Sequence, residues 1–158
     1  MFKSVISAVA LSLLLPASAH AAVTSSGANG ASISIPQSKF TKEAKIIVSG
    51  RNFDETVGIY LAYCVVPKKG ALPSPCGGGV NKSGTGEASY WISSNPPPYG
   101  VGLAIPFAPG GRFTESVAVT RRIGKFDCRK IKCAITVRSD HLHEGDRSHD
   151  IYIPISIK

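Results

Sequence analysis

The chain has 158 residues, with 18 lysines and arginines against 10 aspartates and glutamates, so its formal net charge is +8. This length fits one domain and argues against a multidomain architecture. A basic excess favours encounter with anionic partners, but it says nothing of the fold.

The first 21 residues have the pattern of a secretory signal. Lys3 supplies a positive charge, residues 5–15 form an apolar run too short to span a bilayer, and Ala19 and Ala21 are small residues at the positions that a signal peptidase reads. We therefore expect residues 1–21 to be removed.

The alternative is an amphipathic or membrane-anchored N-terminus. Against it, Pro16 ends the apolar run and no stop-transfer pattern follows. Loss of Lys3 with the signal lowers the net charge from +8 to +7. We expect residues 22–158 to form one exported, monomeric domain, in the extracellular space or cell envelope, without a transmembrane segment.

Seven short segments, rich in β-branched or aromatic residues and bounded by turn residues, predict strands. In chain order they are 31–35, 44–50, 57–64, 87–93, 112–120, 133–139 and 150–157. No segment has a sustained apolar repeat at helical spacing. This pattern favours an all-β antiparallel sandwich or barrel.

Alternation with a period of two assigns the faces of these strands. The predicted core side of the third strand consists of Val57, Ile59, Leu61 and Tyr63, and that of the last strand of Ile151, Ile153, Ile155 and Ile157. Tyr60 then lies on the opposite face. In the fourth strand Tyr90 and Ile92 share a side, which sends Trp91 to the other.

All four cysteines, Cys64, Cys76, Cys128 and Cys133, follow the predicted signal. An even number in an oxidising compartment indicates disulfides. Three pairings are possible, and the sequence alone does not choose among them, although locality favours the pairs nearest in sequence. Spacings of C-x11-C and C-x4-C fit zinc ligation poorly, so we expect no metal at these cysteines.

Three segments carry a family resemblance: VSGRNFDETVGIYLAYC (48–64), PSPCGGG (73–79) and DCRKIKCAITV (127–137). Together they resemble the neocarzinostatin and macromomycin family of secreted actinobacterial apoproteins, over most of residues 30–157. The third segment looks like a disulfide-stapled β-hairpin with a tight turn between its cysteines.

The resemblance implies a seven-stranded immunoglobulin-like β-sandwich with two local disulfides, Cys64–Cys76 and Cys128–Cys133. It also implies a cleft beside one sheet that holds an apolar chromophore. The candidate ligand-binding residues are Tyr60, Trp91, Tyr99 and Phe107. The alternative is that the Pro- and Gly-rich loop 94–111 simply covers Trp91.

A basic run is the second candidate site, for an anionic surface. It contains Arg121, Arg122, Lys125, Arg129, Lys130 and Lys132, opposed only by Asp127. A tight turn would project several of these charges together toward anionic polymers or lipid; the alternative is a solvated loop. Few aromatic residues interleave with the charges, so we expect no specific nucleic-acid recognition.

The loop 138–150 gathers His141, His143 and His149 among acidic residues. Zinc, copper or haem ligation is one interpretation, but the spacing fits no metal motif and ion pairs within the loop are simpler, so we expect no metal and no cofactor. The sequence also lacks a G-x-S-x-G elbow, an H-E-x-x-H motif and a phosphate-binding glycine loop. We therefore expect a protein that is not an enzyme.

Two function hypotheses follow. The first is a secreted carrier of an apolar small molecule, of the antibiotic apoprotein type. The second is a cell-envelope module that recognises an anionic surface or a protein partner, of the kind linked to haem uptake. The sequence names neither the ligand nor the partner.

Overall fold

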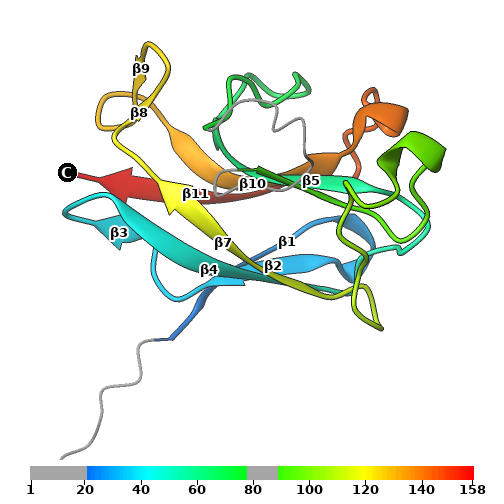
Figure 1. Ribbon diagram of the computed structural model, residues 1–158. Coiled ribbons are helices and arrows are strands. Elements are labelled where there is room, and N and C mark those ends of the chain that lie inside the picture. Colours follow the sequence, from blue (N-terminus) through cyan, green and yellow to red (C-terminus); the bar gives the residue numbers. More distant parts are fainter. Residues whose placement is uncertain (1–20, 78–88) are drawn as a thin grey trace, which may run out of the picture.

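The computed structural model describes residues 21–77 and 89–158, and it forms two β-sheets packed face to face (Figure 1). The predicted signal at 1–20 and the first two residues of the predicted strand 87–93 lie outside the described residues. In the part of the chain described, no helix is long and apolar enough to cross a membrane.

One sheet has four strands in the order β1-β2-β4-β7, all antiparallel. These strands are β1 (Val23–Ser26), β2 (Ser32–Ile35), β4 (Ala44–Arg51) and β7 (Phe113–Val119). The other sheet has five strands in the order β3-β11-β10-β5-β6. These are β3 (Lys39–Phe40), β11 (Ile151–Ile157), β10 (Cys133–Ser139), β5 (Ile59–Val65) and β6 (Ser89–Ile92).

Short elements complete the structure. A two-stranded hairpin consists of β8 (Arg122–Ile123) and β9 (Phe126–Asp127). The described 3₁₀ helices are η1 (Ala28–Gly30), η2 (Pro98–Gly100) and η3 (His141–His143). All seven predicted strands are present, and the all-β, immunoglobulin-like sandwich is confirmed. The strands β1, β3, β8 and β9, of two to four residues, were not predicted.

The core lies between the sheets and follows the predicted alternation. From the five-stranded sheet it receives Ile59, Leu61, Tyr63, Ile135, Val137 and the alternate isoleucines of β11. The four-stranded sheet contributes Ile33, Ile35, Ile46, Val48, Val117 and Val119. Val57 departs from the prediction, because β5 begins at Ile59 and Val57 is only half-buried in the preceding turn. The Tyr63 hydroxyl is buried without a hydrogen-bond partner among described residues, and burial raises its pKa to about 12.

Both disulfides join the cysteines that the family resemblance pairs, Cys64 with Cys76 and Cys128 with Cys133. Cys76 lies beside Cys64 because residues 75–77 pair with the end of β5: the Val65 N–H donates to the Pro75 carbonyl at 3.0 Å. This short segment therefore continues the edge of β5 that β6 occupies further along.

The predicted hairpin between Cys128 and Cys133 is corrected by the structure. The hairpin is β8–β9, whose turn contains Gly124 with φ +55°, and it ends just before Cys128. Residues 128–132 instead form a turn on Asp127, whose carbonyl accepts from the N–H groups of Lys130 and Ile131 at 2.9 and 3.1 Å. The disulfide closes this turn at the entry to β10.

The edge strand β11 is partly covered by the short parallel strand β3. The N–H of Ser156 donates to the Ser38 carbonyl at 2.8 Å, and that of Lys158 to the Phe40 carbonyl at 3.0 Å. Pro154 lies two residues earlier on the same strand and is exposed.

The pairing of Gly50 with Phe113 across β4 and β7 generates a stability prediction. A Cβ at Gly50 would overlap the Phe113 ring, so Gly50→Ala must displace a buried aromatic side chain. We expect a loss of about 1–3 kcal/mol in the free energy of unfolding, measured by urea denaturation. Gly145→Ala is the matched control, because open space surrounds that position, and a change within about 0.5 kcal/mol is expected there. Equal effects of the two substitutions would contradict this packing argument.

Candidate functional site

Four aromatic rings meet on the outer face of the five-stranded sheet, and we call them the aromatic cluster: Tyr60 of β5, Trp91 of β6, Tyr99 of η2 and His141 of η3. The centroid of the Trp91 ring lies 6.4 Å from that of Tyr60, 6.3 Å from that of Tyr99 and 4.9 Å from that of His141. The two 3₁₀ helices that supply Tyr99 and His141 lie together at one end of the sandwich (Figure 1). Four separate elements thus build one group.

Trp91 lies on the predicted face, since its neighbour Ile92 is in the core and its cross-strand partner is Tyr60. It is nevertheless only 5% exposed. The 94–111 loop covers it: Gly100 packs so closely on the indole that a Cβ there would overlap the ring. The loop thus covers one side of the indole.

A buried carboxylate fixes the indole. The Trp91 Nε1–H donates to Asp140 Oδ2 at 2.9 Å, and the N–H of Leu142 donates to Oδ1 at 3.0 Å. Asp140 is fully buried, at the N-cap of η3. Gly58 makes room for it, because a Cβ at Gly58 would overlap the carboxylate. Sequence reasoning placed Asp140 among loop ion pairs and missed this role; the signal was an Asp directly before His-Leu-His, a typical N-cap position.

His141 joins the two tyrosines. Its Nδ1 lies 2.6 Å from the Tyr60 hydroxyl and its Nε2 lies 2.8 Å from the Tyr99 hydroxyl. When the imidazole is neutral, one ring nitrogen carries a proton and the other accepts, so in that form one tyrosine donates and the other accepts. Burial, reinforced by the charge of Asp140, raises the pKa of Tyr60 and keeps its hydroxyl protonated. The guanidinium of Arg138 lies 4.8 Å from the Tyr60 ring centroid, a cation–π contact.

Small side chains line the same outer face between the aromatic cluster and the Cys64–Cys76 disulfide. We call them the floor: Ala62 and Cys64 of β5, with Ala134 and Thr136 of β10. Cross-strand pairing sets Ala134 opposite Cys64 and Thr136 opposite Ala62. All four floor side chains are buried, with at most 5% of each exposed. Tyr152 of β11 lies opposite Thr136 on the same face.

Phe107 does not join the aromatic cluster, and its inclusion in the predicted set is corrected. Residues near Ile105 run beside β6, with the Ile105 N–H donating to the Trp91 carbonyl at 2.9 Å. The chain then turns Phe107 into the core, where its ring centroid lies 6.0 Å from that of Phe53. The sequence could not show this, because Pro-rich loops lack a periodic pattern from which the direction of a side chain follows.

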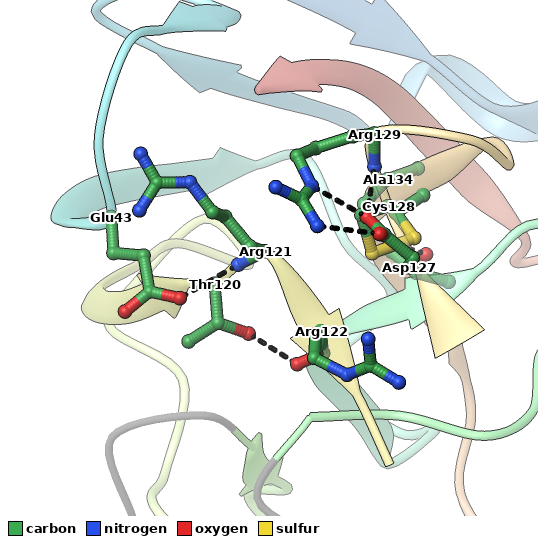
Figure 2. The surroundings of a disulfide bond; sticks show 10 residues. Glu43, Thr120, Arg121, Arg122, Asp127, Cys128, Arg129 and Ala134 are labelled. Carbon is green, nitrogen blue, oxygen red and sulfur yellow. Dashed lines mark hydrogen bonds and ion pairs between the residues drawn. A yellow bond between two sulfur atoms is a disulfide. The ribbon is translucent and has the colours of Figure 1, made fainter. Parts of the chain in front are cut away.

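The six predicted basic residues differ in their contacts, and Figure 2 shows three of them, Arg121, Arg122 and Arg129. Arg121 is structural: its Nε donates to the Lys158 carbonyl at 2.8 Å, and its Nη2 donates to the Thr41 carbonyl at 3.1 Å. Arg129 forms a bidentate pair with Asp127 at 2.9 and 2.7 Å. The hydrogen bonds from Arg129 hold the pKa of Asp127 well below its usual range.

The other four basic side chains, Arg122, Lys125, Lys130 and Lys132, are exposed and form no ion pair with a described residue. Lys125 lies over the Phe126 ring, 5.6 Å from its centroid. Ile131, between two of these lysines, is exposed to 38%. The exposed positive charge therefore gathers on the β8–β9 turn and on the disulfide-closed turn 128–133.

The three histidines of the 138–150 loop do not converge. His141 binds the tyrosines, and His143 is exposed beside Asp140. The Nδ1 of His149 has three oxygens within 3.2 Å, from Ser139, Ser148 and Asp146. A Ser-His-Asp relay uses both ring nitrogens, whereas here all three partners meet one. Within the described ranges, no group of three or more His, Cys, Asp or Glu side chains could hold a metal ion.

Two packed sheets with one disulfide at the end of β5 and a second at the entry to β10 define an immunoglobulin-like sandwich of the small, disulfide-stapled kind. Among solved structures, macromomycin has this fold: it matches 82% of this chain and the whole of its own, with a TM-score of 0.52 at 11% sequence identity. The likeness confirms, at the level of the fold, the resemblance found in the sequence. No family model and no curated protein matches the chain.

The bond between Trp91 and Asp140 generates a second stability prediction. Trp91→Phe keeps a ring but removes the N–H that donates to a fully buried carboxylate. We expect a loss of about 1–3 kcal/mol in the free energy of unfolding by urea denaturation. Tyr99→Phe removes a hydrogen bond from a ring that is 60% exposed, and we expect it to cost less than about 1 kcal/mol. If Trp91→Phe proved as mild as this control, the indole would not anchor the 140–143 segment.

Proposed function

We propose that this protein is an exported, non-enzymatic carrier that binds a planar apolar small molecule on the outer face of its five-stranded sheet. The observation that carries the proposal is the aromatic cluster, whose rings are fixed by hydrogen bonds. Trp91 forms the fixed base, and Tyr60, Tyr99 and His141 offer the more accessible rings.

Preorganisation supports this interpretation. A ligand that met freely rotating tyrosines would lose affinity to the ordering of their side chains, at about 0.5–1.5 kcal/mol each. Here His141 holds both hydroxyls, and Asp140 holds the indole from below. The rings are therefore positioned before any ligand arrives, and offset or edge contacts with a planar molecule add to simple burial.

Export is the second part of the proposal. Both disulfides require an oxidising compartment to form and persist, and the sequence predicts removal of residues 1–21. The shared fold with macromomycin supports a carrier in preference to an enzyme.

Tryptophan fluorescence tests the carrier, because Trp91 is the sole tryptophan of the chain. We expect 1-pyrenemethanol, a neutral planar probe, to quench its emission in a saturable manner and to raise the free energy of unfolding by about 2.7 kcal/mol at a hundredfold excess over Kd. Tyr99→Ala should weaken binding by about three- to tenfold, through loss of one aromatic contact.

Ile47→Ala is the control, because Ile47 is an exposed apolar residue of β4, in the other sheet. It should leave the affinity unchanged. Quenching that rises linearly without saturation, or equal effects of Tyr99→Ala and Ile47→Ala, would show that the aromatic cluster is not the binding site.

The disulfide-closed turn favours a second candidate function, contact with an anionic envelope surface. Lys130 and Lys132 flank the exposed Ile131. Cations on either side of an apolar residue suit the interface of an anionic membrane. The Cys128–Cys133 disulfide keeps these three side chains on one short turn.

Vesicle binding tests this second function. Lys130→Gln with Lys132→Gln should weaken binding to phosphatidylglycerol-containing vesicles by roughly tenfold or more, at about 1 kcal/mol per basic residue near the surface. Raising the salt to about 1 M should act alike, since the Debye length falls to about 3 Å. Arg121 is left intact, because it holds the C-terminus. The control is Arg51→Gln with Arg112→Gln, which removes two charges from the other sheet. An equal loss of vesicle binding in this variant would show that the attraction is non-specific.

A further inference from the structure

A hollow of about 360 Å³ lies at the four-stranded sheet, away from the aromatic cluster and the basic turns. Its lining consists of Ala22, Thr24, Ser32, Ser34, Ser49, Gly50, Arg51, Arg112, Phe113 and Thr114. This volume is at the lower end of the range of small-molecule sites, about 300–1,000 Å³. Neither the proposed carrier function nor the basic turn uses it.

Four hydroxyl groups cross the hollow in one row. The strand register sets Thr24 opposite Ser34, Ser34 opposite Ser49 and Ser49 opposite Thr114. Residues paired in this way across a sheet share a face, here the outer one, and with strands about 4.8 Å apart the row spans about 14 Å. None of these four hydroxyls has a hydrogen-bond partner among the described residues. The row therefore offers unused donors and acceptors to a ligand.

Two arginines stand at one side of this row. Arg51 donates from Nε to the buried Ser32 hydroxyl at 3.1 Å, and Arg112 donates from Nε to the Pro109 carbonyl at 2.8 Å. The terminal nitrogens of both guanidinium groups make no hydrogen bond with a described residue. Each fork is thus held at its base with its outer N–H groups free, a geometry that suits a carboxylate or sulfate.

Charge complementarity selects the ligand. The described residues that line the hollow include two arginines and no acidic side chain. Cleavage after Ala21, which the sequence predicts, would add the ammonium group of Ala22 as a third positive charge. The Phe113 side chain belongs to the core, so among the described lining residues the affinity has to come from the arginines together with the hydroxyls.

We propose that this hollow binds an acidic glycan: the row of Ser and Thr hydroxyls engages the sugar hydroxyls, and Arg51 and Arg112 bind a carboxylate or sulfate on the same chain. The two chemistries are needed together. Hydroxyls alone would compete with water at little net gain, and arginines alone would bind any anion without preference for a sugar.

Binding constants of the full chain, produced by export so that its disulfides form, test the proposal with four polymers. Heparin offers sulfate and carboxylate groups, polygalacturonate offers carboxylate alone, dextran is neutral, and inorganic polyphosphate carries charge without sugar rings. We expect binding to heparin or polygalacturonate and none to dextran. The tighter of the two acidic glycans identifies the anionic group that the arginines prefer.

Three variants divide the site. Arg51→Gln with Arg112→Gln should weaken glycan binding at least tenfold, and the combination Ser34→Ala, Ser49→Ala and Thr114→Val should weaken it at least threefold. Lys130→Gln with Lys132→Gln removes the same charge as the first variant from the other candidate surface and should change affinity less than twofold. Urea denaturation checks that each variant is folded. Amide chemical shifts at Thr24, Ser34, Ser49 and Thr114 locate the glycan on the unaltered protein.

Two results would overturn the proposal. One is an equal or larger loss in the Lys130 and Lys132 variant, which would place acidic polymers on the disulfide-closed turn. The other is polyphosphate binding as tight as glycan binding, with no effect of the hydroxyl substitutions, which would leave charge alone. Neither result involves the aromatic cluster, so the carrier function is tested independently of the glycan site.

Discussion

The two-residue period of the β-strand is the constraint on which the rest of this structure depends. Each long strand gives alternate side chains to the core, and in a sandwich these inner faces fill with isoleucine, valine and leucine. Whatever the protein recognises must therefore be built on the outer faces or the connections. One outer face carries aromatic rings and small side chains, and the other carries hydroxyls and arginines.

The outer face of the five-stranded sheet contains a buried charge, the carboxylate of Asp140, whose loss of hydration is unfavourable. An unpaired carboxylate away from water is expensive, and this one is offset by the indole N–H, by the Leu142 N–H and by a nearby His143. Glycine is required at position 58, because the side chain of another residue there would occupy the space of the carboxylate. Asp140 thus ties the segment 140–142 to Trp91, and Gly100 of the 94–111 loop packs on the same indole.

Local patterns were sufficient to predict the seven main strands and the core faces of β5 and β11. They failed where the deciding contact was distant: β3 exists only because β11 lies beside it, and β8–β9 is too short to have a period. The same limit separates the site residues. Tyr60 and Trp91 lie on the predicted face because the period of their strands sets it, whereas Phe107 lies in a loop that returns to the core.

The basic run makes this point in terms of charge. In the sequence its six cations look equivalent, because nothing local distinguishes a side chain that binds the C-terminal carbonyl from one that extends into solvent. Arg121 is engaged by residues about 40 and 80 positions away, so no local window contains its partners. Arg129 is different, because Asp127 lies only two residues before it, and its neutralisation could have been predicted from that spacing.

The edge of β11 has a further consequence for how copies of this protein behave at high concentration. On this strand the backbone donors at 156 and 158 are taken by β3, and with a period of two the position before them on the same side is Pro154, which has no N–H to offer. From residue 154 to residue 158, this side of β11 therefore offers no free backbone N–H to another extended chain. Proline on an edge strand is one of the features by which β-proteins resist edge-to-edge pairing with other chains. Here it opposes such pairing at the last strand of a domain that we propose to be exported.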